Sequence, residues 1–347
     1  MRVSRGAAKD AWMTREWRGL AASRRGGVTR TTRDVNFGRK STRDVTKGGV
    51  LLRPYEYHAP TTVAEAVALL AEKGEKARPL AGGTDLLVQM RAGRFALERV
   101  VDIKRIPELD TLALDMENGL TLGAAVPCCR IYEHPQVRET YPALVDAVTS
   151  IGGIAIQGRA TVGGNLCNAA SCANSAPPLL VLGATCRIAG RDRERTLPLE
   201  DFFTGSGRTV LRPGELLVSL RVPPSSPGLG ARYLRFTPRA EMDIAVVAVG
   251  AAVFLEEDRS TIRTARIALS VVAATPILVP EAGAALAGMP VSEAAIAVAA
   301  DLAQRAARPR TTMRGTAPHR RHLVGILTER ALWDAVRRAR GETIDGR

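Results

Sequence analysis

The stretch TVGGNLCNAASCANSAPPLL occupies residues 161–180 and places two adjacent glycines between a threonine and an asparagine. A second glycine pair stands in AGGTDLL, at residues 81–87. Glycine has no Cβ, so backbone N–H groups beside it can approach a ligand closely. Successive free N–H groups form an anion-binding nest, and a flanking threonine adds a hydroxyl donor for a phosphate oxygen. Together the two loops could hold one pyrophosphate, although glycine pairs also make tight turns that bind nothing.

Neither loop carries a standard nucleotide-binding signature. No Gly-Lys-Ser/Thr follows, as a Walker A loop would require. Neither loop has the spacing Gly-x-Gly-x-x-Gly, so a Rossmann site for NAD is unsupported. The residues alone therefore indicate two candidate anion-binding loops in a protein that mixes helices and strands.

The charge of the chain is concentrated at its start. Of the 347 residues, 46% are hydrophobic and 24% are charged, which is ordinary for two or three packed domains. The formal net charge is +14, but residues 1–50 hold 13 Lys and Arg against 4 Asp and Glu. We predict that residues 1–50 are a basic, disordered extension and that nucleic acid is not the partner. A basic binding protein that acts through this segment remains an alternative.

The cysteines and the hydropathy argue against a disulfide-rich, metal-binding or membrane-spanning protein. Five cysteines without a Cys-x-x-Cys pair make neither a disulfide framework nor a metal site on this chain. No apolar run reaches the roughly 18 residues of a membrane-spanning helix, and the start lacks the compact apolar core of a signal peptide. We expect a cytoplasmic protein.

Hydrophobic periodicity predicts the elements around the two loops. Thr62 and Glu65 form a capping box before a helix that Gly74 ends. Further helices are expected at 141–152, 293–306 and 322–339, and strands at 77–80, 99–103, 119–126, 214–222, 244–255 and 265–273. The Pro- and Gly-rich stretch at 223–230 reads as a linker. The predicted domains are 51–107, 108–224 and 229–340.

Several motifs occur in an order that resembles one known family. They are PYEYHAPTTVAEAVALL (54–70), AGGTDLL, TVGGNL, SAPPLLVLGA (175–184), PGELLVSLRVP (213–223) and RGTAPHRRHLVGILTERAL (314–332). In this order the chain resembles the FAD-binding middle (medium) subunit of molybdenum hydroxylases, the family of aerobic carbon monoxide dehydrogenase and xanthine dehydrogenase. The resemblance runs from about residue 53 to about residue 339.

The resemblance implies a fold and a function. The fold would be α+β: a vanillyl-alcohol-oxidase-type FAD-binding fold of two α/β subdomains, followed by a C-terminal α+β domain with an antiparallel sheet and helices. FAD would lie extended between the subdomains and be bound noncovalently. Molybdopterin and [2Fe-2S] clusters would belong to a large and a small partner subunit. Electrons would pass through FAD to NAD+, oxygen, a quinone or another acceptor; the alternative is a self-contained FAD-dependent oxidase of the same fold.

The resemblance also assigns site residues, none of them catalytic and none a metal ligand. The first pyrophosphate loop would be Ala81, Gly82, Gly83, Thr84, Asp85 and Leu86, and the second would be Thr161, Gly163, Gly164 and Asn165. Asn174 stands where the family commonly has an Asp near the FAD ribose, and its carbonyl could still accept a hydrogen bond. Tyr233 and Arg235 would lie beside the flavin ring, where a cation could stabilise the reduced flavin; otherwise Tyr233 is a core residue and Arg235 a solvated one.

Overall fold

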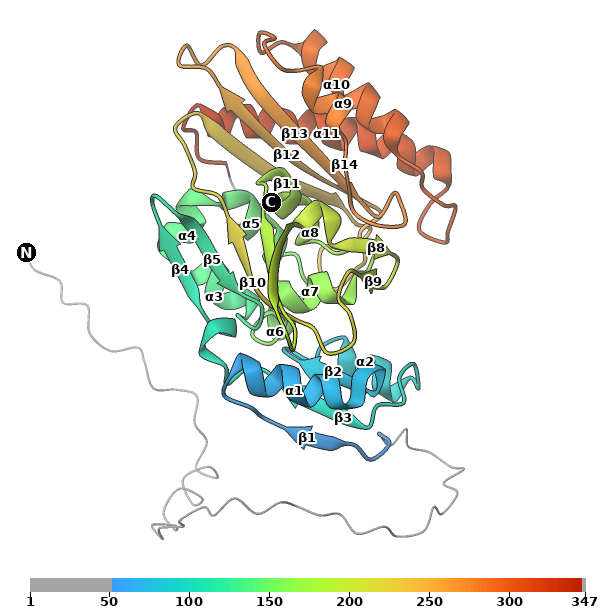
Figure 1. Cartoon of the computed structure of the whole chain (residues 1–347). Coiled ribbons are helices and arrows are strands. Elements are labelled where there is room, and N and C mark those ends of the chain that lie inside the picture. The colour runs from blue at the N-terminus through green and yellow to red at the C-terminus, as the bar shows by residue number, and fades with distance from the viewer. Residues whose placement is uncertain (1–51, 345–347) are drawn as a thin grey trace, which may run out of the picture. The chain divides into compact units, whose positions relative to one another are not determined.

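The computed structural model describes residues 52–344 (Figure 1). The predicted extension at residues 1–50 lies outside the described residues. Within residues 52–344, no helix combines the length and the apolarity that crossing a bilayer requires.

A small parallel sheet begins the described part. Its strands are β1 (Glu56–His58), β2 (Ala77–Leu80) and β3 (Arg99–Asp102), in the order β1-β3-β2. Helix α1 (Val63–Lys73) and the 3₁₀ turn η2 (Gly74–Lys76) join β1 to β2, and α2 (Leu86–Arg91) joins β2 to β3. The Thr62 hydroxyl caps α1 by accepting from the Glu65 N–H at 3.2 Å, as the capping box predicts.

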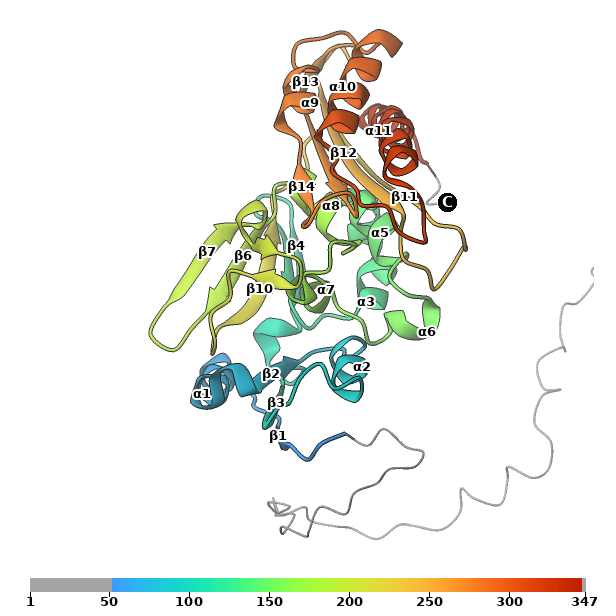
Figure 2. The ribbon, with the colours of Figure 1, turned by 90° about the vertical axis from the view of Figure 1, so that its right-hand side faces the viewer.

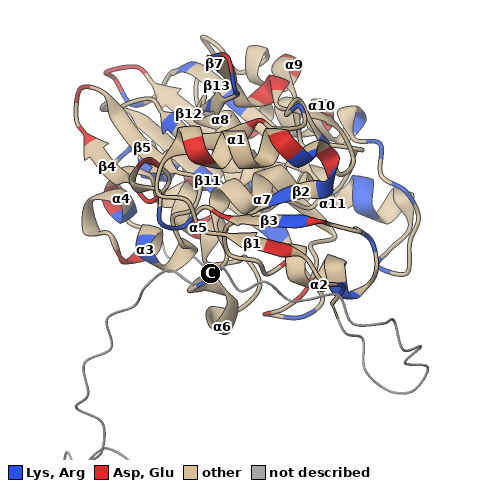
Figure 3. Cartoon of the chain, turned by 60° about the horizontal axis from the view of Figure 1, so that its bottom comes forward, with Lys and Arg blue, Asp and Glu red and all other residues tan. Residues whose placement is uncertain are grey.

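Charged side chains of this sheet pair across its elements. Arg99 is 5% exposed, and its guanidinium contacts Glu56 at 2.6 Å and Glu72 at 2.8 Å. Lys76 contacts Glu98 at 2.7 Å. Figure 3 shows acidic and basic residues interspersed over α1, β1 and β3. The surface over α1, β1 and β3 therefore has no large patch of a single charge sign (Figure 3).

A five-stranded antiparallel sheet follows, in the order β4-β5-β10-β6-β7. Its strands are β4 (Leu112–Asp115), β5 (Gly119–Gly123), β6 (Thr185–Ala189), β7 (Glu194–Pro198) and β10 (Leu216–Val222). The helices around it are η3 (Pro107–Leu109), α3 (Cys128–Glu133), α4 (Pro135–Thr140), α5 (Pro142–Val148), α6 (Ile154–Gln157), α7 (Val162–Asn168), α8 (Ala176–Val181) and η4 (Leu199–Asp201). Strands β8 (Phe203–Gly205) and β9 (Arg208–Thr209) form a separate hairpin.

The C-terminal part is a four-stranded antiparallel sheet with helices on one face (Figures 1 and 2). Its strands are β11 (Leu229–Phe236), β12 (Val247–Leu255), β13 (Ile262–Ser270) and β14 (Ile277–Leu278), and its helices are α9 (Pro280–Ala284), α10 (Glu293–Ala306) and α11 (Ala317–Ala339). Strand β12 alternates: Val249 and Val253 pack in one core with α9, α10 and α11. On the opposite face, a Cβ added to Gly250 would lie 2.8 Å from the Pro177 carbonyl oxygen, so α8 rests directly on the sheet. The expected α+β architecture is confirmed.

Several segments differ from their sequence-based predictions. The helix expected at 141–152 ends at Val148 as α5, and the strand expected at 119–126 ends at Gly123 as β5. The last helix begins at Ala317 rather than at 322, because the Thr316 hydroxyl caps it by accepting from the His319 N–H at 3.3 Å. The segment expected as a glycine loop, TVGGNL at 161–166, lies mostly in helix α7, which runs through both glycines. Its cap is the Thr161 hydroxyl, which accepts from the Gly164 N–H at 2.9 Å.

A buried ion cluster joins the C-terminal sheet to the five-stranded part. Asp146 on α5 contacts Arg232 of β11 at 3.1 Å and Arg338 of α11 at 2.7 Å. All three side chains are less than a tenth exposed. The Asp146 carboxylate also accepts from the Tyr233 N–H at 3.3 Å. One carboxylate thus holds a strand and a helix of the C-terminal part against α5.

Candidate functional site

The two glycine segments meet at one cavity of about 700 Å³, within the range of small-molecule sites. Both the parallel sheet and the five-stranded sheet contribute to its walls, through Pro79 of β2 and Leu216 of β10. The predicted site residues that line it are Ala81, Gly82, Gly83, Thr84, Asp85, Leu86, Thr161, Gly163, Gly164 and Asn165. The structure therefore brings both predicted pyrophosphate loops to the same space.

The glycines allow the two segments to touch each other. A Cβ on Gly82 would lie 1.9 Å from the Arg159 carbonyl oxygen, and one on Gly163 would lie 2.4 Å from the Ala124 carbonyl oxygen. Gly83 has φ +76°, a conformation that favours glycine. The sequence predicts that the missing side chains make room for a ligand. The space beside Gly82 is instead filled by the backbone of Arg159, directly before the second segment, and the space beside Gly163 by Ala124, after β5. The first contact fixes the two segments relative to each other, and the second fixes α7 against the five-stranded part.

Backbone donors remain open on both segments. Within the described residues, the N–H groups of residues 82–85 and of Gly163 donate to no acceptor. The Thr161 hydroxyl accepts from Gly164, so its proton is still available to a ligand. Clustered free N–H groups at a cavity are the donor set that an anionic phosphate needs. The residues present therefore fit a pyrophosphate.

The cavity has a surplus of positive charge that sequence reasoning missed. Its lining includes Arg78, Arg94, Arg208 and Arg212. Within the described part of the chain, none of these four forms an ion pair with a carboxylate within 4.0 Å. The guanidiniums of Arg78 and Arg94 lie 4.8 Å and 5.7 Å from the Phe95 ring centroid. These arginines are scattered singly along the sequence, so no local pattern identifies them.

Two titratable groups at the cavity favour their neutral forms more than usual. Desolvation raises the pKa of the Asp85 carboxyl, at the start of α2. Burial raises the pKa of the Cys167 thiol to about 12, so this thiol is protonated at neutral pH. All five cysteines are free, and no three His, Cys, Asp or Glu side chains among residues 52–344 are grouped to hold a metal ion.

One side-chain hydrogen bond joins the two short helices of the glycine segments, α2 and α7. Gln89 of α2 donates from Nε2 to Oδ1 of Asn168 on α7, at 2.9 Å. Both residues line the cavity. This bond ties the helix after the first glycine segment to the end of the helix that contains the second, and no local sequence pattern predicts it.

Asn174, Tyr233 and Arg235 are not among the residues that line this cavity. The Tyr233 hydroxyl donates to Asn174 Oδ1 at 3.0 Å, and Asn174 Nδ2 donates to the Ser150 carbonyl at 3.1 Å. Tyr233 is 3% exposed, and burial raises its pKa. Arg235 donates to the Asp243 carbonyl at 3.4 Å. The structure thus joins Asn174 to Tyr233 in the core, and their roles toward a ribose and a flavin stay predictions.

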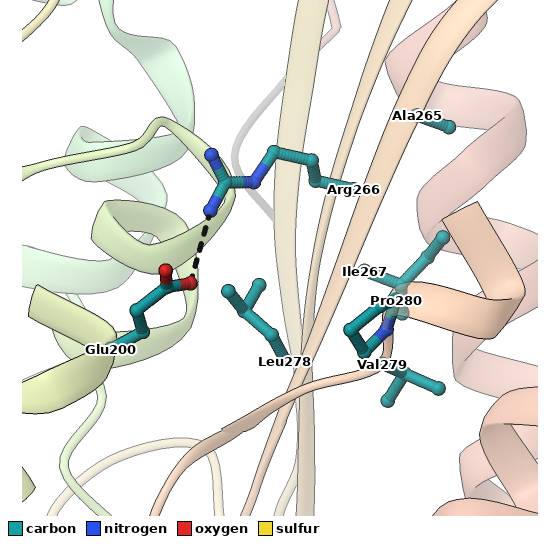
Figure 4. Close-up of a pocket in the computed structure, with 7 residues that line it drawn as sticks. All are labelled: Glu200, Ala265, Arg266, Ile267, Leu278, Val279 and Pro280. Carbon is teal, nitrogen blue, oxygen red and sulfur yellow. Dashed lines mark ion pairs between the residues drawn. The ribbon is translucent and has the colours of Figure 1, made fainter. Parts of the chain in front are cut away.

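A second cavity, of about 310 Å³, lies between η4 and strands β13 and β14 (Figure 4). Arg266 reaches across it to Glu200, with 3.6 Å between Nη2 and Oε2. The other side chains that line it are apolar: Ala265, Ile267, Leu278, Val279 and Pro280. Its two charged groups satisfy each other, so the larger cavity is the candidate site.

Comparison with known proteins decides the family. Residues 53–225 match the FAD binding domain in molybdopterin dehydrogenase, and residues 232–335 match the CO dehydrogenase flavoprotein C-terminal domain. Over 287 residues the chain is 32% identical to the putative xanthine dehydrogenase FAD-binding subunit of Escherichia coli (strain K12), which covers 82% of this chain and 97% of that protein. This chain belongs to the FAD-binding subunits of the xanthine and carbon monoxide dehydrogenases.

Other relatives of this FAD-binding subunit agree in sequence and in fold. It is 34% identical over 282 residues to the carbon monoxide dehydrogenase medium chain of Hydrogenophaga pseudoflava, covering 80% of this chain and 96% of that one. The solved carbon monoxide dehydrogenase from Hydrogenophaga pseudoflava superposes with a TM-score of 0.78 at 31% identity, covering 82% and 98% of the two chains. Quinoline 2-oxidoreductase from Pseudomonas putida 86 gives 0.77 at 28% identity, covering 83% and 99%. The resemblance found in the sequence is confirmed, and the relatives are oxidoreductase subunits.

Proposed function

We propose that this subunit holds FAD in the larger cavity and transfers electrons within a molybdenum hydroxylase complex. The observation that carries the proposal is the convergence of both glycine segments on one cavity, with open backbone N–H donors from each. The pyrophosphate would lie against residues 81–86 and residues 161–165. Neither glycine segment contains a histidine, which supports noncovalent binding.

The chain's own groups bind and orient the cofactor. Bound FAD supplies the exchange of electrons between one-electron and two-electron carriers. The open N–H groups and the unpaired arginines of the cavity offset the phosphate charge. The apolar side chains of Ile151, Leu216 and Leu217 line another part of the cavity and can exclude water from a flavin ring.

The partners follow from the family. We propose a large molybdopterin subunit and a small iron–sulfur subunit, with the domains of this chain at 51–107, 108–224 and 229–340. The relatives support this arrangement, since carbon monoxide dehydrogenase has this type of chain as its medium chain. NAD+, oxygen, a quinone or another acceptor would take the electrons. We propose that the complex is located in the cytoplasm.

The test is the composition of the complex isolated from the source cells. Full-length chain carrying an affinity tag is purified with its companions, and the released flavin, molybdenum and iron are quantified. We expect one FAD per chain, together with molybdenum and iron. FAD without molybdenum or iron would favour the self-contained oxidase, and a preparation without FAD would contradict the proposal.

A further inference from the structure

A buried serine orients the amide side chain that directly follows the second glycine pair. Asn165 follows Gly164 directly and lines the cavity. Its Oδ1 accepts from the Ser175 hydroxyl at 2.7 Å and from the Ser175 N–H at 3.3 Å. Two donors on one atom identify that atom as the carbonyl oxygen. The Asn165 Nδ2 group therefore carries two N–H donors, which have no acceptor among the described residues.

Ser175 is placed rigidly for this task. It is 0% exposed and stands at the N-cap of α8, yet its hydroxyl makes no capping bond. The segment that leads to it is held from two sides: the Ala169 carbonyl accepts from Gly207 at 2.8 Å, and the Ser171 carbonyl accepts from Val271 at 2.7 Å. The Ser175 hydroxyl is thus used for Asn165 rather than for its own helix.

We infer that Ser175 is a positioning residue, which turns the Asn165 carboxamide so that its N–H donors face the bound pyrophosphate. The inference rests on the proposed FAD site. With the opposite orientation, the carbonyl oxygen would point at the phosphates and repel them. Asn165 in the observed orientation adds side-chain donors to the open backbone N–H group of Gly163.

The test is a double-mutant cycle on the FAD affinity of the full chain. Cofactor-free protein with Ser175→Ala, Asn165→Ala or both changes is titrated with FAD, and flavin fluorescence reports binding. We expect Ser175→Ala to weaken binding about fivefold to tenfold when Asn165 is present, and to have no effect in the Asn165→Ala background. Ser270→Ala is the matched control, because Ser270 is also 0% exposed and its hydroxyl has no partner among the described residues.

An equal loss in both backgrounds would mean that Ser175 acts through packing alone, and would overturn the inference. Unchanged affinity in Ser175→Ala would overturn it as well. Asn165→Asp keeps the Ser175 bonds but directs a carboxylate oxygen at the cavity, so it should bind FAD more weakly than Asn165→Ala; equal or tighter binding would contradict the inference. Wild-type chain that binds no FAD would instead refute the proposed function.

Discussion

Gly82 illustrates why single glycines matter at this site. A Cβ there would lie 1.9 Å from the Arg159 carbonyl oxygen, so Gly82→Ala must separate the two glycine segments. We expect the free energy of unfolding to fall by about 1–3 kcal/mol or more. We also expect the variant to lose most of its FAD affinity in a fluorescence titration. Gly158→Ala is the control: its Cβ would meet nothing within 4 Å and its φ is −69°, so it should match the wild type. Normal FAD binding by Gly82→Ala would contradict the geometry.

Asp85 should make FAD binding depend on pH. Its pKa is already raised by desolvation, and a nearby pyrophosphate would raise it further. Because the protonated form then binds the anion more tightly, the affinity should rise as the pH falls from neutral into the range where this carboxyl, with its raised pKa, becomes protonated. Asp85→Asn should bind FAD more tightly at neutral pH and lose most of this dependence, as titrations across that range would show.

The control for Asp85 is Asp192→Asn, in the exposed turn between β6 and β7, which should retain the wild-type pH dependence. An Asp85→Asn variant that binds FAD more weakly than the wild type at neutral pH would contradict this account. It would show that the carboxylate accepts a hydrogen bond from the ligand.

At the residue scale, the sequence predicts which glycine-segment residues line the cavity. It does not predict the contacts that require glycine there. Both glycine pairs stand out locally, and all ten glycine-segment residues predicted for the site line the cavity. Glycine is required at positions 82 and 163 because Arg159 and Ala124 lie against them. Each neighbour is distant in sequence from the glycine that it contacts, so no local pattern predicts these contacts. The unpaired Arg78 and Arg94 could not be predicted either, because their shared contact with Phe95 arises only when β2 and the segment after α2 fold together.

At the scale of elements, Asp146 should be the main attachment of the C-terminal sheet. Asp146→Asn leaves the buried Arg232 and Arg338 without their full counter-charge, which we expect to cost about 3–5 kcal/mol of unfolding free energy. Urea denaturation measures the change. Asp301→Asn removes an exposed ion pair with Arg305 on α10 and should cost less than about 1 kcal/mol. Equal costs for the two variants would contradict the assigned role.

Elements with local signals were predicted, and those that depend on distant contacts were not. Helices α1 and α10 begin directly after Thr62 and Ser292, whose hydroxyls cap them. The sequence predicts both helices, and the capping box predicts the cap at Thr62. Helix α7 was missed because two glycines weigh against a helix by propensity. The contact of Gly163 with Ala124 and the Thr161 cap outweigh that cost.

At the scale of the whole molecule, the first 49 residues should be dispensable for the cofactor. The residues that match the family begin at 53, and all residues found to line the cavity lie after that point. Chain lacking residues 1–49 should keep the FAD affinity and the unfolding midpoint of the full chain. A marked loss of FAD affinity on truncation would support the alternative in which the basic segment carries the function.

The central claim is that the two glycine segments together hold a pyrophosphate. The most direct measurement compares the affinity of the cofactor-free full chain for FAD with its affinity for riboflavin, which has the same ring system but no phosphates. Several charge-assisted hydrogen bonds to the phosphates should make FAD bind at least about 100-fold more tightly. Equal affinity for the two ligands would show that the glycine segments do not hold the pyrophosphate, and would contradict the account.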